Sequence, residues 1–324
     1  MREGRKIGAA LEVSREIPAY NLLHSLMRFP LTWFSAAVLF FPNAQAAAQA
    51  NQANSGIEDA VFVYQLLSDN PDCPTIEQRL SQMTLRNTAI VSMEGGGFVL
   101  DRENGEQQVQ CMLDALHRSG TAAKLMLLQD VSFLSNRPEA LRRIRAVSAF
   151  AKKHGGLSGA VIDIEPHMDD GWSSGSVNTR RAIAARYLSL LRELRQASRP
   201  VPFYACVPWW FESPRDVPQL NAKHLSQAMD GVYVMVYGGA AGPHGIADDI
   251  LKRVPPTGSF MKHGRVYLVL ATEDEESPAS MDRAIAHLRQ QYRSSSSFAG
   301  TAVFHAKSPY RPPTQKPPSG GEKD

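Results

Sequence analysis

Eight short apolar runs recur along the middle of the chain, and each has the length of a buried β-strand. Their starts are separated by roughly 28 to 43 residues, the spacing of a strand, a helix and their loops. The runs are Ala60–Leu67, Thr88–Met93, Lys124–Gln129, Gly159–Glu165, Pro202–Val207, Gly231–Tyr237, Arg265–Glu273 and Gly300–Ala306. The repeat predicts eight strands in one domain.

Amphipathic helical patterns lie between several of these runs. They span Glu106–Ser119, Pro138–Gly155, Asn178–Ala197 and Pro278–Arg293. Alternating strands and helices favour a parallel sheet, and eight strands favour its closure into a (β/α)8 TIM barrel. The sequence after Ala306 leaves no room for a full last helix, so we expect an incomplete outer ring. An open doubly wound sheet is the alternative.

The first part of the chain carries the pattern of an export signal. Leu31–Phe41 is an apolar run of about 11 residues, short of the roughly 20 that span a bilayer, and Ala44–Ala46 is an A-x-A cleavage pattern. The stretch before Met27 is too long and too mixed in charge for the basic start of a signal. We therefore interpret residues 1–46 as a mis-assigned start, with Met27 as the true one, followed by a signal peptide. The alternative is a buried helix.

The remaining boundaries follow from composition. Residues 47–56 read as a small, polar linker, and residues 307–324 as a disordered tail rich in proline and glycine. The folded part is then 57–306, a common size for one barrel. We expect a secreted or periplasmic monomer with no membrane span after signal cleavage.

Composition and charge exclude several other classes of protein. Hydrophobic residues make up 43% and charged residues 21% of the chain, as in folded globular proteins. A net charge of +3 without a basic stripe argues against a nucleic-acid partner. Cys73, Cys111 and Cys206 are not spaced as zinc ligands, which leaves a Cys73–Cys111 bridge open if the protein is exported. We expect no metal and, since no phosphate-binding glycine loop follows a strand, no cofactor.

The fourth predicted strand carries the strongest chemical signal. Side chains alternate across a strand, so Val161, Asp163 and Glu165 share one face, and the opposite, wholly apolar face must pack on helices. Both acids then point into the barrel at its carboxyl-terminal end, where barrel enzymes have their active sites. Two carboxyl groups this close resist joint ionisation, so the pKa of one of them should rise. Glu165 suits a general acid, and Asp163 a partner that stays charged or shares the proton. A capping or salt-bridged pair is the structural alternative.

Other strand ends contribute candidates to the same rim. The valines of the sixth strand form one face, which leaves Tyr237 pointing into the barrel mouth. The same alternation directs Glu273 inward at the end of the seventh strand, as a third candidate catalytic carboxylate. Tyr64 of the first strand is a candidate substrate contact. Tyr237 could instead be a packed core residue.

Aromatic residues cluster where these strands end. Trp209 and Trp210 follow the fifth strand, Phe304 lies in the eighth, and Trp172 follows the fourth. Sugar rings stack their C–H faces on such side chains, so carboxylates surrounded by tryptophans indicate a carbohydrate ligand. His167 is a further candidate contact beside Glu165. At least one of Trp209 and Trp210 is expected to be structural.

The motifs resemble those of family 18 glycoside hydrolases, the chitinase-like barrels, over most of the folded region. Gly159–Glu165 resembles the end of the D-x-x-D-x-D-x-E signature, Met235–Tyr237 the Met-x-Tyr motif, and Phe304 stands near the usual pocket-floor tryptophan. The resemblance implies a retaining, substrate-assisted glycosidase acting on N-acetylhexosamine units. Glu165 would protonate the glycosidic oxygen. Asp163 and Tyr237 would bind the 2-acetamido group, whose carbonyl oxygen attacks the anomeric carbon.

The chain also departs from that family. Ser158 and Val161 replace the two upstream acids of the signature, and Gly238 replaces the acid that commonly follows the tyrosine. Two other functions therefore remain open. One is a retaining glycosidase that uses Glu165 and Glu273 as its two carboxylates. The other is a non-catalytic, glycan-binding barrel.

Overall fold

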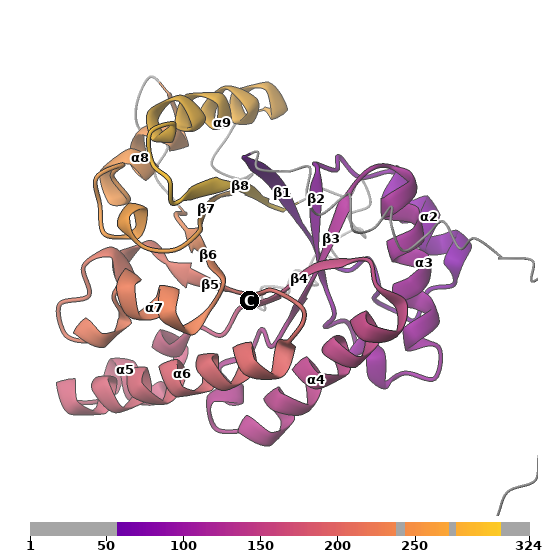
Figure 1. The fold of residues 1–324 in the computed structure, drawn as a ribbon, viewed down its shortest axis with the longest axis horizontal. Coiled ribbons are helices and arrows are strands. Elements are labelled where there is room, and N and C mark those ends of the chain that lie inside the picture. Colours follow the sequence, from indigo (N-terminus) through magenta and orange to yellow (C-terminus); the bar gives the residue numbers. More distant parts are fainter. Residues whose placement is uncertain (1–56, 238–243, 272–276, 306–324) are drawn as a thin grey trace, which may run out of the picture. The chain divides into compact units, whose positions relative to one another are not determined.

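The computed structural model describes residues 57–237, 244–271 and 277–305. Its eight strands form one closed, all-parallel barrel in the order of the sequence (Figure 1). The strands are β1 Glu58–Val63, β2 Thr88–Ser92, β3 Ala122–Leu127, β4 Leu157–Ile162, β5 Phe203–Pro208, β6 Gly231–Met235, β7 Val266–Ala271 and β8 Phe298–Phe304. Because β8 pairs with β1, the predicted barrel is confirmed and the open sheet is excluded.

The junction of β8 with β1 requires a glycine. Gly300 pairs with Glu58 and has a φ of 152°, a conformation that side chains with a Cβ rarely adopt. A Cβ at this position would overlap the carbonyl oxygen of Glu58. The last strand therefore closes the barrel at a point where the two backbones are in direct contact.

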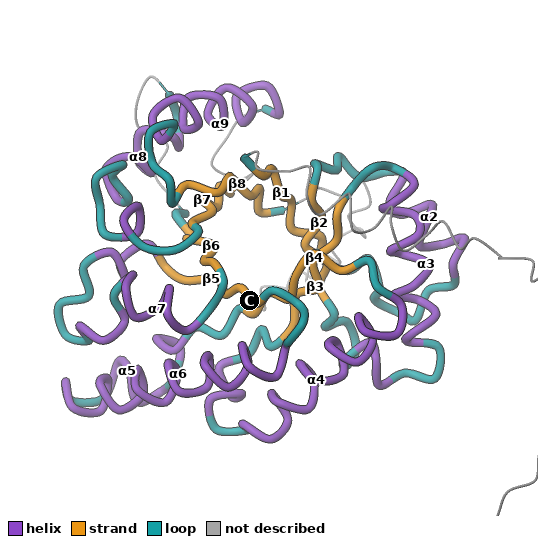
Figure 2. The backbone as a smooth tube through the Cα atoms, viewed as in Figure 1, coloured by secondary structure: helices purple, strands orange, loops and turns teal. Residues whose placement is uncertain are grey.

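Helices surround the ring of strands (Figure 2). They are α2 Cys73–Ser81, α3 Gly105–Arg118, α4 Arg137–His154, α5 Asp170–Ser174, α6 Val177–Ser198, α7 Ala222–Ala228, α8 Ile246–Arg253 and α9 Pro278–Tyr292. Several begin at capping side chains: the hydroxyls of Ser176 and Ser277 accept backbone N–H groups of the first turns of α6 and α9. The expected helices correspond to α3, α4, α6 and α9, whereas the shorter α2, α5, α7 and α8 carried no clear periodic signal.

Strand alternation divides the core into two parts, as predicted for β4, β6 and β7. Alternate side chains fill the barrel interior: Ala60, Phe62, Ile90, Met126, Val161, Tyr204, Cys206, Tyr233, Met235, Tyr267, Val269 and Ala302. The intervening positions, including Ile162, Ile164, Val234 and Leu268, pack against the helices. The barrel is therefore filled, and chemistry is confined to its ends.

A buried cation lies in the amino-terminal half of the interior. The Lys124 side chain is only 2% exposed, and its Nζ lies 2.5 Å from Oε1 of Glu58 and donates to the Tyr233 hydroxyl at 2.7 Å. The same nitrogen lies 4.5 Å from the ring centre of Tyr204 and 4.8 Å from that of Tyr267. Burial lowers the pKa of Lys124 to about 8, with Glu58 opposing that effect. This cluster holds β1, β3, β5, β6 and β7 together, away from the carboxyl-terminal end of the barrel.

Cys73 and Cys111 form a disulfide between α2 and α3, with Cα atoms 5.6 Å apart, while Cys206 is a buried free thiol. The bridge closes a loop of 38 residues. The sequence alone left this disulfide open, and the structure contains it.

The predicted signal peptide (1–46), linker (47–56) and tail (307–324) lie outside the described residues. The question of a last helix after Ala306 lies outside them as well, since His305 is the last residue described. Within 57–237, 244–271 and 277–305, no helix is both long and apolar enough to cross a membrane.

Candidate active site

The carboxylate pair sits where the backbone leaves β4. Asp163, Ile164 and Glu165 continue the chain past Ile162, and the short 3-10 helix Pro166–Met168 follows. Ile164 is fully buried against the helices, so Asp163 and Glu165 lie on the same face as the interior residue Val161. The predicted alternation is confirmed, and both acids stand at the carboxyl-terminal end of the barrel.

Asp163 is the more deeply placed acid. Its Oδ1 is buried without a hydrogen-bond partner among the described residues. Burial, and then the charge of Glu165, raise the pKa of Asp163 from 3.8 to about 7. An unpaired buried carboxyl oxygen is costly and is typical of functional sites. Glu165 keeps 33% of its side chain exposed, so it is the acid that an incoming ligand reaches first.

Three aromatic side chains stand on the opposite wall of the mouth. Tyr64, from the end of β1, packs edge-on to Phe304 of β8 at 5.5 Å between ring centres. Tyr237, just past β6, lies 5.4 Å from the same ring. Burial raises the pKa of both phenols, and the charges of Asp163 and Glu165 add to it. Tyr237 is nevertheless 38% exposed, so part of this side chain can be reached from solvent.

His167 connects the pair to the tryptophans. Its Nε2 lies 3.9 Å from Oε1 of Glu165, just beyond direct hydrogen-bond distance, and its Nδ1 is buried without a partner among the described residues. Burial lowers the pKa of His167, with Glu165 opposing the effect, which favours the neutral imidazole. The ring meets Trp210 edge to face at 5.5 Å.

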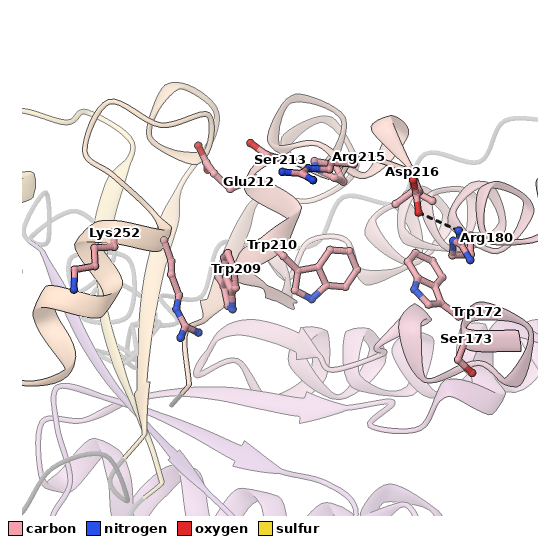
Figure 3. A pocket seen from close by; sticks show the side chains of 13 residues that line it. Trp172, Ser173, Arg180, Trp209, Trp210, Glu212, Ser213, Arg215, Asp216 and Lys252 are labelled. Atoms are coloured by element: carbon pink, nitrogen blue, oxygen red, sulfur yellow. Dashed lines mark hydrogen bonds and ion pairs between the residues drawn. The ribbon is translucent and has the colours of Figure 1, made fainter. Parts of the chain in front are cut away.

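A cavity of about 880 Å³ opens beside this histidine (Figure 3). Trp172, Trp209 and Trp210 line it, together with Ser173, Arg180, Glu212, Ser213, Pro214, Arg215, Asp216, Val217, Lys252 and Arg253. Asp163 and Glu165 do not line it. Trp209 and Trp210 are both half-buried, and each packs against the helix-side core and also lines the cavity. The tryptophans therefore line a cavity next to the carboxylate pair.

The structure thus brings together six of the predicted residues at the barrel mouth: Tyr64, Asp163, Glu165, His167, Tyr237 and Phe304. Trp209 and Trp210 form the adjoining cavity. Glu273 lies outside the described residues, so its role stays a prediction. At the positions where the family 18 signature has acids, Val161 packs in the barrel interior, and Ser158 Oγ donates to the Ala123 carbonyl at 2.8 Å.

The cations around the cavity could not be anticipated from any sequence motif. Arg180 comes from α6, Arg215 from the loop after β5, and Lys252 and Arg253 from α8. No local motif links them, because the topology brings them together from separate parts of the chain. Cys206 was also missed as a neighbour of the site; burial raises the pKa of its thiol, and the charges of Asp163 and Glu165 add to that effect.

One group of metal-ligating side chains occurs among the described residues. Atoms of His244, Asp248 and His287, from α8 and its entry loop and from α9, lie within 4.8 Å of one another. The two imidazoles stack face to face, with centres 4.0 Å apart and planes 14° apart. Imidazole lone pairs lie in the ring plane, so stacked rings do not direct both nitrogens at one ion. Neither Asp163 nor Glu165 belongs to this group.

Comparison with known proteins supports the fold. No protein-family model matches the chain, and no curated protein sequence is significantly similar to it. Among solved structures, the exo-beta-1,4-mannosidase Op5Man5 from Opitutaceae bacterium strain TAV5 matches with a TM-score of 0.56 and 11% identity, over 79% of this chain and 54% of that one. The chain therefore spans about half the length of that protein.

Two further structures are similar. A GH5_18 protein from Streptomyces cattleya, in complex with Manb1-4GlcNAc, has a TM-score of 0.54 and 10% identity, over 77% of this chain and 71% of that one. A GH18 chitinase from Pseudoalteromonas aurantia has a TM-score of 0.49 and 13% identity, over 76% and 93%. At such identities the first two show a shared (β/α)8 barrel, and the third adds no argument for family 18.

Proposed function

We propose that the protein is a glycoside hydrolase in which Glu165 is the general acid/base. The observation that carries the proposal is the pair of acids on one inward face at the carboxyl end of β4, with an unpartnered buried oxygen on Asp163 and its pKa raised to about 7. Glycosidases usually cleave the glycosidic bond with two neighbouring carboxyl groups whose environments differ. The barrels of the mannosidase and the GH5_18 protein agree with this class of enzyme.

We further propose that catalysis is retaining and substrate-assisted on N-acetylhexosamine units. The exposed Glu165 protonates the glycosidic oxygen as the bond to the leaving sugar breaks. The 2-acetamido carbonyl oxygen attacks the anomeric carbon, and Asp163 accepts the acetamido N–H at its unpartnered Oδ1. The Tyr237 hydroxyl donates to the acetamido oxygen from the opposite wall. Water then opens the cyclic intermediate, with Glu165 as the base.

Ser158 and Val161 replace the two upstream acids of the family 18 signature, which changes what determines the pKa of Asp163. Val161 lies beneath it, and burial and then the charge of Glu165 raise its pKa. Below about pH 7 the Asp163 carboxyl is therefore largely protonated. We expect hydrolysis to be fastest on the acidic side of neutrality.

A second mechanism uses Glu273 as the nucleophile, with Glu165 as acid/base. This alternative needs no acetamido group, so it predicts cleavage of plain hexosides and loss of activity in Glu273→Gln. The substrate-assisted route predicts that glycans lacking the 2-acetamido group are left intact.

A non-catalytic, glycan-binding barrel is the remaining candidate. Val161 and Ser158 favour it, because two acids of the family 18 signature are missing at those positions. The raised pKa of Asp163 beside Glu165 favours an enzyme, because proton transfer uses two acids of different proton affinity whereas sugar binding does not need them.

We also propose that the protein is exported. The apolar run and cleavage pattern before Ala47 support this, and so does the Cys73–Cys111 disulfide, since such bonds persist in oxidising compartments. The amino-terminal sequence of the protein recovered outside the cytoplasm tests this point; a terminus far from Ala47 contradicts it.

Hydrolysis of defined glycans by Glu165→Gln tests the main proposal. The purified protein is incubated with chitin oligomers, peptidoglycan and partly deacetylated exopolysaccharide, and the products are identified with their anomeric configuration. Glu165→Gln should abolish cleavage while keeping the wild-type melting temperature. The matched control is Glu103→Gln, an exposed acid beside α3 that should behave as wild type. Wild-type turnover by Glu165→Gln on every cleaved glycan would refute the assignment.

A further inference from the structure

We propose that the tryptophan-lined cavity beside the carboxylate pair binds a segment of a linear, anionic polysaccharide, one whose sugar rings carry carboxylate or sulfate groups. This inference rests on the proposed glycosidase function and names the class of substrate that the site prefers. It is argued from the aromatic surface, the charges around it and its connection to Glu165.

The aromatic surface is extended in one direction. Trp209, Trp210 and Trp172 lie in a row between Lys252 at one end and Arg180 at the other (Figure 3). The rings of Trp172 and Trp210 are 5.9 Å apart between centres. Consecutive flat rings in a row suit consecutive sugar rings of an unbranched chain, because each pyranose can place a C–H face on an indole. A small, compact ligand would leave most of the row uncovered.

The cavity lining carries four cationic side chains, Arg180, Arg215, Lys252 and Arg253, and two acidic ones. Both of its acids are engaged: Glu212 accepts backbone N–H groups of Ser259 and Phe260, and Asp216 pairs with Arg180 at 3.0 Å. Among the described residues, no ion-pair or hydrogen-bond partner is found for the exposed side chains of Arg215 and Lys252.

Arg253 adds a fixed positive charge to one end of the row. Its guanidinium lies 4.8 Å over the Trp209 ring, donates to the Tyr237 carbonyl and pairs with Asp249 at 3.0 Å. Arg215 and Lys252 are thus the two cations free to meet anionic groups of a ligand, at separate points along the row. A neutral glycan would use the indoles and leave these two charges unmatched.

The cavity is connected to the catalytic pair through one residue. Trp210 contacts His167 at 5.5 Å, and His167 lies 3.9 Å from Glu165. A chain lying along the tryptophans therefore passes Trp210, which contacts His167 beside Glu165, so we place subsites for sugars near the cleaved bond at this part of the row. A nucleic acid is disfavoured, because two free cations and a net charge of +3 fall short of the basic stripe that a phosphate backbone needs.

Binding of sugar hexamers that differ only in charge tests the proposal. Cellohexaose is compared with the β-1,4-linked glucuronic acid hexamer, and chitin hexamer with its 6-O-sulfated form, at low and high salt, by calorimetry and tryptophan fluorescence. We expect the anionic member of at least one pair to bind about tenfold tighter at low salt, and most of that preference to vanish at high salt. No preference at low salt, or tighter binding of oligo(dT) than of any sugar, would overturn the proposal.

Charge variants locate the effect. Arg215→Ser with Lys252→Ser should reduce the affinity for the anionic hexamer about tenfold and leave the neutral one unchanged. The matched control is Arg145→Ser with Lys152→Ser, which removes one exposed arginine and one exposed lysine from α4 outside the cavity. An equal loss in both double variants would overturn the proposal.

The outcomes also separate the two proposals. Cleavage of neutral glycans without any anionic preference refutes this inference and leaves the glycosidase intact. Anionic preference that depends on Arg215 and Lys252, with no cleavage of any glycan, refutes the glycosidase and leaves a binding site.

Discussion

Replacing Asp163 by asparagine should stabilise the protein at neutral and alkaline pH. The pKa of this carboxyl rises from 3.8 to about 7 on folding, because burial and the charge of Glu165 penalise the ionised form. A group with a raised folded pKa contributes stability below its unfolded pKa and loses it as the pH passes the folded value. The unfolding free energy of the wild type should therefore fall between about pH 4 and pH 7.

The size of the effect follows from the same values. Each tenfold change in proton affinity is worth about 1.4 kcal/mol, so a pKa moved from 3.8 to about 7 corresponds to at most about 4 kcal/mol. Asp163 keeps part of its surface in solvent, and screening reduces the expected gain from Asp163→Asn to about 2 kcal/mol above pH 7. At pH 4 the two proteins should be equally stable, because both then carry a neutral side chain.

Urea unfolding from pH 4 to pH 8.5 measures this directly. The wild type, Asp163→Asn and the control Asp170→Asn, an exposed acid at the start of α5, are compared at each pH. The gain should appear in Asp163→Asn alone and grow with pH, while its glycan turnover is lost. A constant difference between wild type and Asp163→Asn at all pH values would refute the assignment of a strained, functional acid.

Three further predictions address other parts of the molecule. Tyr237→Phe should lower the turnover number by about one hundredfold, since a donor to the reacting group is lost. The melting temperature should not change, because the ring still packs on Phe304. A lower melting temperature at an unchanged turnover number would show that Tyr237 is a core residue. Cys73→Ser with Cys111→Ser should lower the unfolding free energy by about 4 kcal/mol, because the bridge closes a loop of 38 residues. Dithiothreitol should cause the same loss in the wild type and no further loss in the double variant. Glu58→Gln should destabilise the barrel by about 3 kcal/mol, as the buried Lys124 loses its anion; an unchanged urea midpoint would contradict that role.

The fold could be predicted from the sequence largely because alternate residues of each strand have different environments. One set packs against the helices, and the other points into the barrel. In β4 the apolar Ile162 and Ile164 had to face helices, and that requirement alone placed Asp163 and Glu165 in the barrel. Closure followed from the number of strands. The Gly300 contact with Glu58 that completes the ring could not be inferred, because it depends on the exact register of β8 on β1.

Only some of the residues that line the adjoining cavity could be predicted from the sequence. Trp209 and Trp210 stood out because they directly follow a strand, whereas Arg215 and Lys252 come from segments whose proximity is a tertiary property. The stacked His244 and His287 illustrate the same limit, since they lie far apart in the sequence. Residues at strand ends can be predicted from strand periodicity, because a barrel brings these ends to one mouth. The proximity of residues on loops and helices, such as Arg215, Lys252 and His287, cannot be predicted in this way.

The most direct test of the central claim compares leaving groups. A general acid matters most when the leaving sugar is a poor leaving group and little when the leaving group departs unaided. With Glu165→Gln, hydrolysis of the best natural glycan should fall by about three orders of magnitude or more. The first step on the matching dinitrophenyl glycoside should stay within about tenfold of wild type. Equal losses on the two substrates, or no loss on either, would contradict the role of Glu165 as the acid that protonates the glycosidic oxygen.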